Sequence, residues 1–173
     1  MDMLWSMNGT PPSKYSAGRQ LLALLGWLGL CFAAAGSAAF ISPGSWYAGL
    51  HKPSWNPPAW IFGPVWTLLY VLMAVAAWLV WRAGGWRRQG RALGLFLLQW
   101  LLNFLWTPVF FGLHHMLLAF VDIMALWIVL VAAVISFWRI RTVAGLLLVP
   151  YVAWVTFAAV LNFTLWRLNS VGP

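Results

Sequence analysis

The chain has 173 residues, of which 64% are hydrophobic and only 7% are charged, and its mean hydropathy is +0.85. A soluble domain carries roughly 25% charged residues, so this chain is too poor in polar side chains to cover a water-facing surface. The composition therefore excludes a soluble globule. It predicts an all-α, multi-pass integral membrane protein.

Long charge-free runs predict five membrane-spanning helices, because about 20 apolar residues cross the hydrocarbon core of a bilayer. In chain order they cover residues 20–41, 60–81, 92–111, 117–138 and 143–166. These spans leave little chain outside the membrane, which predicts one five-helix membrane domain over 20–169. Residues 1–19 are expected to form a disordered N-terminal tail, and 170–173 a short C-terminal tail.

The first span ends in CFAAAGSAAF, whose small residues suit a signal peptidase. Its apolar stretch of about 20 residues is longer than the roughly 7–15 residues of a signal-peptide core. The pattern therefore favours an uncleaved first helix over a signal peptide. Cys31 in this helix has no second cysteine to pair with and is expected to be a small core residue.

Basic residues are unevenly divided between the two ends of the predicted helices. Eight of the ten lie before the first helix or in the connections at 82–91 and 139–141, whereas Lys52 and Arg167 lie at the other end. Because basic loops stay on the cytoplasmic side, we expect a cytoplasmic N-terminus in a bacterial cell membrane, with the loop at 46–66 and the C-terminus outside. The net charge of +8 then suits anionic lipid headgroups, and no nucleic-acid-binding module is present.

The loop WYAGLHKPSWNPPAWIFGPVW, residues 46–66, concentrates tryptophan and proline between the first two spans. An interfacial aromatic belt accounts for some of the tryptophans. It does not account for KPSWNPPAW, where each proline fixes its own φ and restricts the preceding residue. We therefore expect a stiff series of turns that forms a lid over one end of the bundle.

Three predicted helices carry aromatic and amide side chains at helical spacing, so that each series shares one face. The series are Phe62, Trp66 and Tyr70; Gln99, Asn103, Trp106 and Phe110; and Tyr151, Trp154, Ala158 and Asn162. Amides are costly against lipid tails, so Gln99, Asn103 and Asn162 should face the bundle interior. Gln99 and Asn162 either bond helices together or line a pocket, and for Asn103 we favour the pocket.

Groups for acid–base or metal chemistry are few. The only acidic residues are Asp2 and Asp122, so no carboxylate pair is available and no catalytic residue is predicted. Asp122 lies within a span, where we expect a buried hydrogen-bonding or packing contact rather than catalysis. His51, His114 and His115 are expected on the same side of the membrane, but they lack the regular spacing of metal ligands, so neither a metal nor a cofactor is predicted.

The sequence resembles the translocator protein family, also called tryptophan-rich sensory proteins, peripheral-type benzodiazepine receptors or TspO/MBR proteins, and in particular its bacterial type. Three stretches carry the resemblance in the same order: WYAGLHKPSWNPPAWIFGPVWTLLY, LLQWLLNFLWTPVFF and VPYVAWVTFAAVLNFTLWRLN. With five spans at similar spacing, the resemblance covers nearly everything from the first helix to Asn169.

The resemblance implies a membrane receptor, sensor or transporter that binds porphyrins of the protoporphyrin IX type and similar flat hydrophobic ligands, and that regulates tetrapyrrole metabolism or a stress response. The porphyrin would be a ligand rather than a cofactor, and the alternative is an enzyme that degrades porphyrin with light and oxygen. The residues implied to line the ligand site, under the loop between the first two helices, are Trp46, Tyr47, Trp55, Asn56, Pro57, Pro58, Trp66, Asn103, Trp106, Trp154, Ala158 and Leu161.

Two partner interactions known in the family fit this sequence unequally. The proposed sterol motif needs a tyrosine between a Leu or Val and a Lys or Arg, and here Phe163 and Thr164 stand between Leu161 and Arg167. This departure weakens the expectation of a sterol partner. The family is often dimeric, and Gly90 and Gly94 have the GxxxG spacing that supports helix association, so a homodimer is expected.

Overall fold

The computed structural model describes residues 15–41 and 44–170. Within them, five helices are long and apolar enough to cross a membrane. They are α1 (Ala17–Phe40), α3 (Phe62–Arg82), α4 (Gly85–Thr107), α5 (Met116–Ile140) and α6 (Thr142–Ser170). The predicted all-α, five-helix membrane bundle is confirmed.

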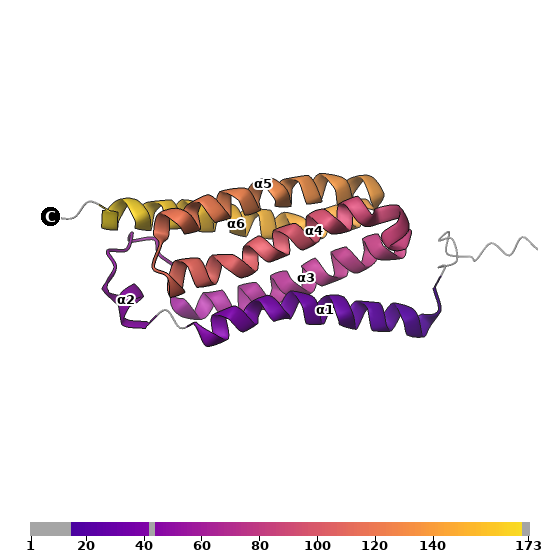
Figure 1. Cartoon of the computed structure of the whole chain (residues 1–173), viewed down its shortest axis with the longest axis horizontal. Helices are drawn as coiled ribbons and strands as arrows, with labels where there is room; N and C mark the ends of the chain where they lie inside the picture. The colour runs from indigo at the N-terminus through magenta and orange to yellow at the C-terminus, as the bar shows by residue number, and fades with distance from the viewer. Residues whose placement is uncertain (1–14, 42–43, 171–173) are drawn as a thin grey trace, which may run out of the picture.

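The helices form one elongated bundle (Figure 1). Around it, α1 contacts α3, α3 contacts α6, α6 contacts α5, α5 contacts α4, and α4 returns to α1, while α3 and α4 also touch each other. The α1–α3 loop lies at the end of the bundle where α6 ends. The α3–α4 and α5–α6 connections lie at the opposite end, where α1 begins (Figure 1).

Apolar residues of different sizes fill the centre of the bundle. Met73, Ala77 and Val80 recur along one face of α3 and are fully buried, as is Cys31 of α1, which the sequence predicted to be a core residue. The outer faces are apolar instead of polar, as a lipid-facing surface requires: Ile128 on α5 is 62% exposed. The bundle therefore combines a close-packed interior with an apolar exterior.

A glycine allows a close contact between two helices where α5 turns into α6. Only Arg141 separates the two helices, and its N–H donates to the carbonyl of Phe137 at 2.8 Å. A Cβ added to Gly145 would lie 2.9 Å from Cβ and Cε3 of Trp138 and 3.0 Å from its Cα. Gly145 is therefore the residue that lets α6 lie against the backbone of α5.

Three helix ends differ from the sequence-based expectation. Helix α1 begins at Ala17, inside the tail expected over 1–19, of which residues 1–14 lie outside the described part. Helix α4 begins at Gly85 instead of 92, but Gln89 has non-helical backbone angles (φ −113°, ψ 16°), so a kink separates its first residues from the spanning part. Helix α6 continues to Ser170, the first residue of the expected C-terminal tail, whose other residues are not described. The expectation placed these three ends beside Arg19, Arg91 and Arg167, whereas a helix satisfies its own backbone groups in lipid and headgroup zone alike.

Three short elements at the loop end of the bundle were not predicted. The loop begins with a short helix, α2 (Gly44–Gly49), and ends with one 3₁₀ turn, η1 (Ala59–Ile61), before α3. At the end of α4 the chain widens into a π-helical turn, η2 (Pro108–Gly112). Proline has no N–H to donate to the preceding turn, and such π turns occur often at functional sites.

Candidate ligand-binding site

The loop between α1 and α3 packs on the end of α4 through two aromatic residues of α2. The Trp46 ring lies edge-on to Phe110, with 5.6 Å between ring centroids. Tyr47 lies edge-on to Phe111 at 5.4 Å. Phe110 is 1% exposed, so α2 is seated on a buried part of the bundle. The first two predicted site residues are thereby placed at the mouth of the bundle.

Hydrogen bonds within the loop hold its shape. The Tyr47 hydroxyl donates to Oδ1 of Asn56 at 3.2 Å, and Nδ2 of Asn56 donates to the Pro57 carbonyl at 3.1 Å. The Asn56 N–H also closes a turn on the carbonyl of Pro53 at 3.0 Å. Burial raises the pKa of the Tyr47 hydroxyl above its ordinary value, and the hydrogen bond to Asn56 acts in the opposite direction. Asn56 therefore shapes the loop with both ends of its amide.

A second set of hydrogen bonds fastens the loop to the end of α6. The backbone N–H of His51 donates to Oδ1 of Asn169 at 2.9 Å, and Nδ2 of Asn169 donates to the carbonyl of His51 at 3.0 Å. One side-chain amide thus pairs with both backbone groups of a residue 118 positions away. We name this pair of bonds the His51–Asn169 clamp.

We expect Asn169→Ala to loosen the loop without unfolding the bundle. The variant loses both bonds of the clamp, which are exposed and worth about 0.5–1.5 kcal/mol each. Amide hydrogen exchange, read by mass spectrometry on peptides covering residues 44–58, should become faster. Ser170→Ala, one residue further on, is the control. Unchanged exchange at 44–58 in Asn169→Ala would show that the clamp does not hold the loop.

A row of four aromatic rings runs from the loop to α3 by way of α6, and we call it the α6 row. Trp55 lies edge-on to Phe157 at 5.9 Å, Phe157 is 5.5 Å from Trp154, and Trp154 lies 5.7 Å from Phe62. Two of these four, Trp55 and Trp154, were predicted site residues. Phe157 was missed, although its position three residues after Trp154 puts it on the same side of the helix.

A second row joins α2 to the end of α4, and we call it the α4 row. It contains Trp46, Tyr47, Phe110 and Trp106, in which Trp106 stacks on Phe110 at 4.9 Å. The indole N–H of Trp106 donates to Oδ1 of Asn162 on α6 at 3.1 Å, and Nδ2 of Asn162 donates to the Met116 carbonyl at 2.9 Å. Asn162 thus bonds helices together, the first of its two sequence-based interpretations.

The remaining predicted residues divide between the interior and the surface. Trp66 stacks on Tyr70 at 5.2 Å. Ala158 is half-buried and packs against the same core as Trp66, Trp106 and Trp154. Leu161 is 6% exposed, in the cluster that contains Phe110. Pro57 is half-buried, whereas Pro58 is exposed, and Trp55 is 46% exposed.

Several polar side chains are buried in the interior of the bundle. Gln99 and Tyr151 are fully buried, and Asn103 is 7% exposed. Within the described part of the chain, neither end of the Gln99 amide, nor Nδ2 of Asn103, nor the Tyr151 hydroxyl has a hydrogen-bond partner. A buried polar group left unbonded costs about 1–3 kcal/mol. These side chains are therefore candidates for hydrogen bonding to a polar group of a ligand. Gln99 and Tyr151 were not among the predicted site residues.

The three histidines and Asp122 do not form a metal-binding cluster. Among the residues that the structure describes, no three His, Cys, Asp or Glu side chains lie together as metal ligands would. His114 has φ +58° and stacks on Trp46 at 4.1 Å, so it extends the α4 row. Asp122 is half-buried, and its Oδ2 has no hydrogen-bond partner among the described residues.

Known proteins are similar to this chain over most of its length. The model of the TspO/MBR family matches residues 21–167. The tryptophan-rich protein TspO of Chlorobaculum tepidum is 46% identical over 156 residues, covering 87% of this chain and 98% of the relative. Protein CrtK of Rhodobacter capsulatus is 42% identical over 80% of this chain and 88% of the relative. The human translocator protein is 42% identical over 72% and 75%. The match runs through all five spanning helices and the loop that covers them, and the chain belongs to the TspO/MBR family.

Proposed function

We propose that the protein is a membrane receptor that binds porphyrins of the protoporphyrin IX type, and similar flat hydrophobic molecules, between the α6 row and the α4 row under the α1–α3 loop. The observation that carries the proposal is the convergence of aromatic side chains from the loop, α3, the end of α4 and α6. Relatives named as tryptophan-rich sensory and translocator proteins support a receptor role.

The chemistry of the two rows suits a flat, aromatic ligand. Tryptophan and phenylalanine rings offer large apolar faces that stack on other rings, each pair contributing about 0.5–1.5 kcal/mol beyond burial. The loop above them is already ordered by Asn56 and by the His51–Asn169 clamp. A site that is ordered before binding loses less conformational entropy when the ligand enters.

The proposal is tested by titrating the purified protein with protoporphyrin IX in the dark while its tryptophan fluorescence is followed. Saturable quenching is expected in the wild type, with weaker affinity in Trp154→Leu. Trp86→Leu, which changes an exposed tryptophan at the opposite end of the bundle, is the matched control. Quenching that never saturates would overturn the porphyrin assignment.

A second candidate function is the light- and oxygen-dependent degradation of a bound porphyrin. It is favoured by Trp55 and Trp154 of the α6 row, which are two of the redox-active side chains of the site. Illuminating the saturated complex in air separates the two functions. Stable porphyrin absorbance supports the receptor, whereas bleaching that is lost in Trp55→Phe and Trp154→Phe supports the enzyme.

We expect Ala158→Thr to weaken porphyrin binding without unfolding the protein. Ala158 is half-buried and packs against the same core as Trp66, Trp106 and Trp154, and a larger side chain there overpacks the interior at a cost of about 1–3 kcal/mol. A loss in affinity of about tenfold corresponds to about 1.4 kcal/mol. Ala153→Thr, at an exposed position on the same helix, is the control for the added hydroxyl. A binding curve identical to the wild type would remove Ala158 from the site.

The proposed orientation puts the loop outside the cell and the arginine-rich end in the cytoplasm. Seven arginines of the described chain lie at that end. Arg82 ends α3, Arg87, Arg88 and Arg91 lie near the start of α4, Arg139 and Arg141 lie at the end of α5, and Arg19 lies near the start of α1. The proposed homodimer has its support in α4, where a Cβ added at Gly90 or Gly94 would meet no atom within 4 Å. The two glycines thus leave space for a close approach by another helix.

A further inference from the structure

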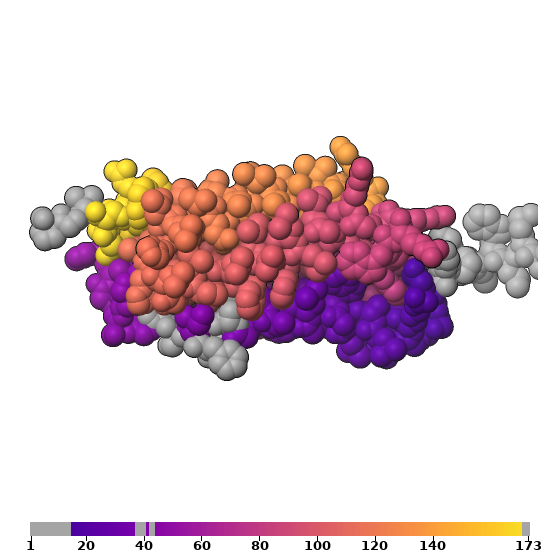
Figure 2. All heavy atoms as spheres, in the orientation of Figure 1, coloured from indigo at the N-terminus to yellow at the C-terminus, as the bar shows by residue number. Residues whose placement is uncertain are grey.

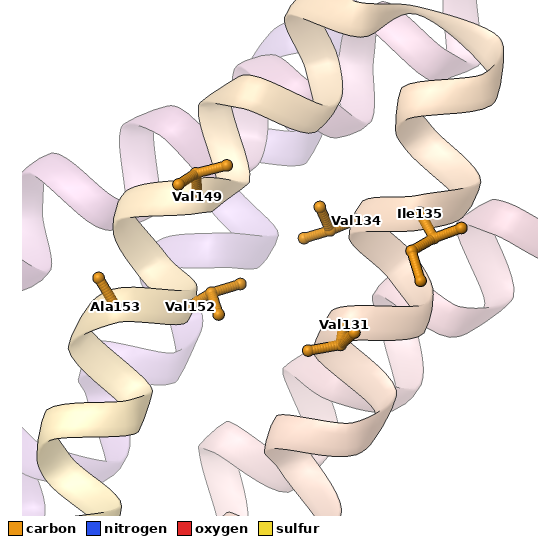
Figure 3. A pocket seen from close by; sticks show the side chains of 6 residues that line it. All are labelled: Val131, Val134, Ile135, Val149, Val152 and Ala153. Carbon is orange, nitrogen blue, oxygen red and sulfur yellow. The ribbon is translucent and has the colours of Figure 1, made fainter.

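A groove on the outer face of α5 and α6 lies away from the two aromatic rows. Its volume is about 340 Å³. Figure 3 shows how the two helices face each other across it, each with three small or branched apolar side chains one turn apart. The lining residues are Val131, Val134, Ile135, Val149, Val152 and Ala153.

The groove continues toward the arginine-rich end of the bundle, where a positively charged side chain lines it. A second hollow of about 280 Å³ shares Val134 and Ile135 with the first and adds Trp138 and Arg139. Trp138 is held in place because its side chain packs on Gly145 of α6. The apolar lining and Arg139 thus form one continuous surface, and Arg139 lies near the end of α5.

The charge of Arg139 has no counterpart in the described part of the chain. The sequence contains two acidic residues, Asp2 and Asp122, and Asp122 lies near the other end of α5, 17 positions before Arg139. Arg141 follows two positions later. An anion that neutralises this end of the groove therefore comes from outside the described residues. The adjoining apolar lining selects an anion that carries a hydrocarbon chain.

We propose that this groove is a binding site for one acidic phospholipid, whose acyl chain lies along α5 and α6 and whose phosphate pairs with Arg139. The leaflet that supplies it is the one at the arginine-rich end. Basic pockets between transmembrane helices bind acidic headgroups in this way, and each basic residue near such a headgroup contributes enough to change binding about fivefold. Trp138 beside the arginine suits the same depth, since tryptophan settles at the membrane interface.

The experiment measures which lipid the full-length protein keeps. The protein is incorporated into nanodiscs containing equal amounts of palmitoyl-oleoyl phosphatidylglycerol and phosphatidylcholine, released into mild detergent, and weighed by native mass spectrometry. We expect one retained phosphatidylglycerol in the wild type and about fivefold less in Arg139→Gln. Arg139→Lys, which keeps the charge, should retain the lipid.

Two further variants test the position of the site. Ala153→Phe fills the groove without changing the charge and should also lose the lipid, whereas Leu101→Phe, an exposed position on α4, should not. Arg87→Gln removes a charge of the same end away from the groove and should retain it. Circular dichroism melts establish that each variant is folded before its lipid content is compared.

Three results would overturn the proposal. Equal retention of the two lipids by the wild type would show that the groove holds ordinary bulk lipid. An equal loss in Arg87→Gln and Arg139→Gln would show general attraction to the charged end of the bundle. A wild-type dimer that Ala153→Phe converts to monomer would show that a second copy of the chain covers this face.

Discussion

Gly145→Ala is expected to destabilise the protein by about 1–3 kcal/mol, the usual cost of overpacking a filled interior, and Gly145→Leu by more. The reason lies in what the added carbon would meet. One of the three nearest atoms is the Cα of Trp138, at 3.0 Å. A side chain can rotate away from such a contact, but a backbone atom cannot. Relief requires α5 and α6 to separate along a long shared interface.

The measurement is unfolding in mixed detergent and SDS micelles, followed by circular dichroism. Gly26→Ala is the matched control because it makes the same chemical change in a spanning helix, α1, at a position where an added Cβ meets no atom within 4 Å. Alanine is the better helix former by about 1 kcal/mol, so the control should be as stable as the wild type or more so. Equal stability of Gly145→Ala and Gly26→Ala would contradict the close contact at Gly145.

Asn162→Leu is expected to destabilise the protein by about 1–3 kcal/mol and to weaken porphyrin binding. The variant loses two bonds between helices, to the Trp106 indole and to the Met116 carbonyl. Single bonds of this kind in membranes contribute about 0.6 kcal/mol on average and about 1.7 kcal/mol at most. Trp106 is also released from the orientation in which it stacks on Phe110, so the α4 row loses its fixed geometry.

Thr164→Val separates the two effects of the asparagine change. Thr164 lies two residues further on and bonds only within its own helix, to the carbonyl of Val160 at 2.8 Å. Its replacement should change neither the unfolding curve nor the protoporphyrin titration. An Asn162→Leu protein with wild-type affinity and lowered stability would mean that Trp106 is not part of the site.

Periodicity and charge predicted the helices well because the bilayer itself imposes the pattern. A span must be apolar over about 20 residues, and the five predicted runs each correspond to one long helix. The ends were less predictable. Arg87 and Arg88 lie in the first residues of α4, before the kink at Gln89, where the composition rule expected a connection, because a helix needs no apolar side chains once it has left the hydrocarbon.

The packing of the candidate site could be predicted where it depends on spacing along one helix. Trp66, Trp106, Trp154 and Ala158 follow helical steps and pack against one core. Contacts between segments that are far apart in the chain have no corresponding pattern in the sequence. The pairing of His51 with Asn169 joins two backbone groups to one amide, and nothing in either local sequence marks the partner. The seating of α2 on Phe110 is equally a product of how the helices pack.

Helix α1 begins and helix α6 ends at opposite ends of the bundle, and this has an engineering consequence. In many soluble domains the termini lie close together, so a short linker can join them and new ends can be opened elsewhere. Here α1 begins at one end of the bundle and α6 finishes at the other (Figures 1 and 2). A linker joining them would have to cross the roughly 30 Å hydrocarbon layer, so circular permutation requires a sixth membrane span. Reporter domains fused to the two ends would for the same reason report from different compartments.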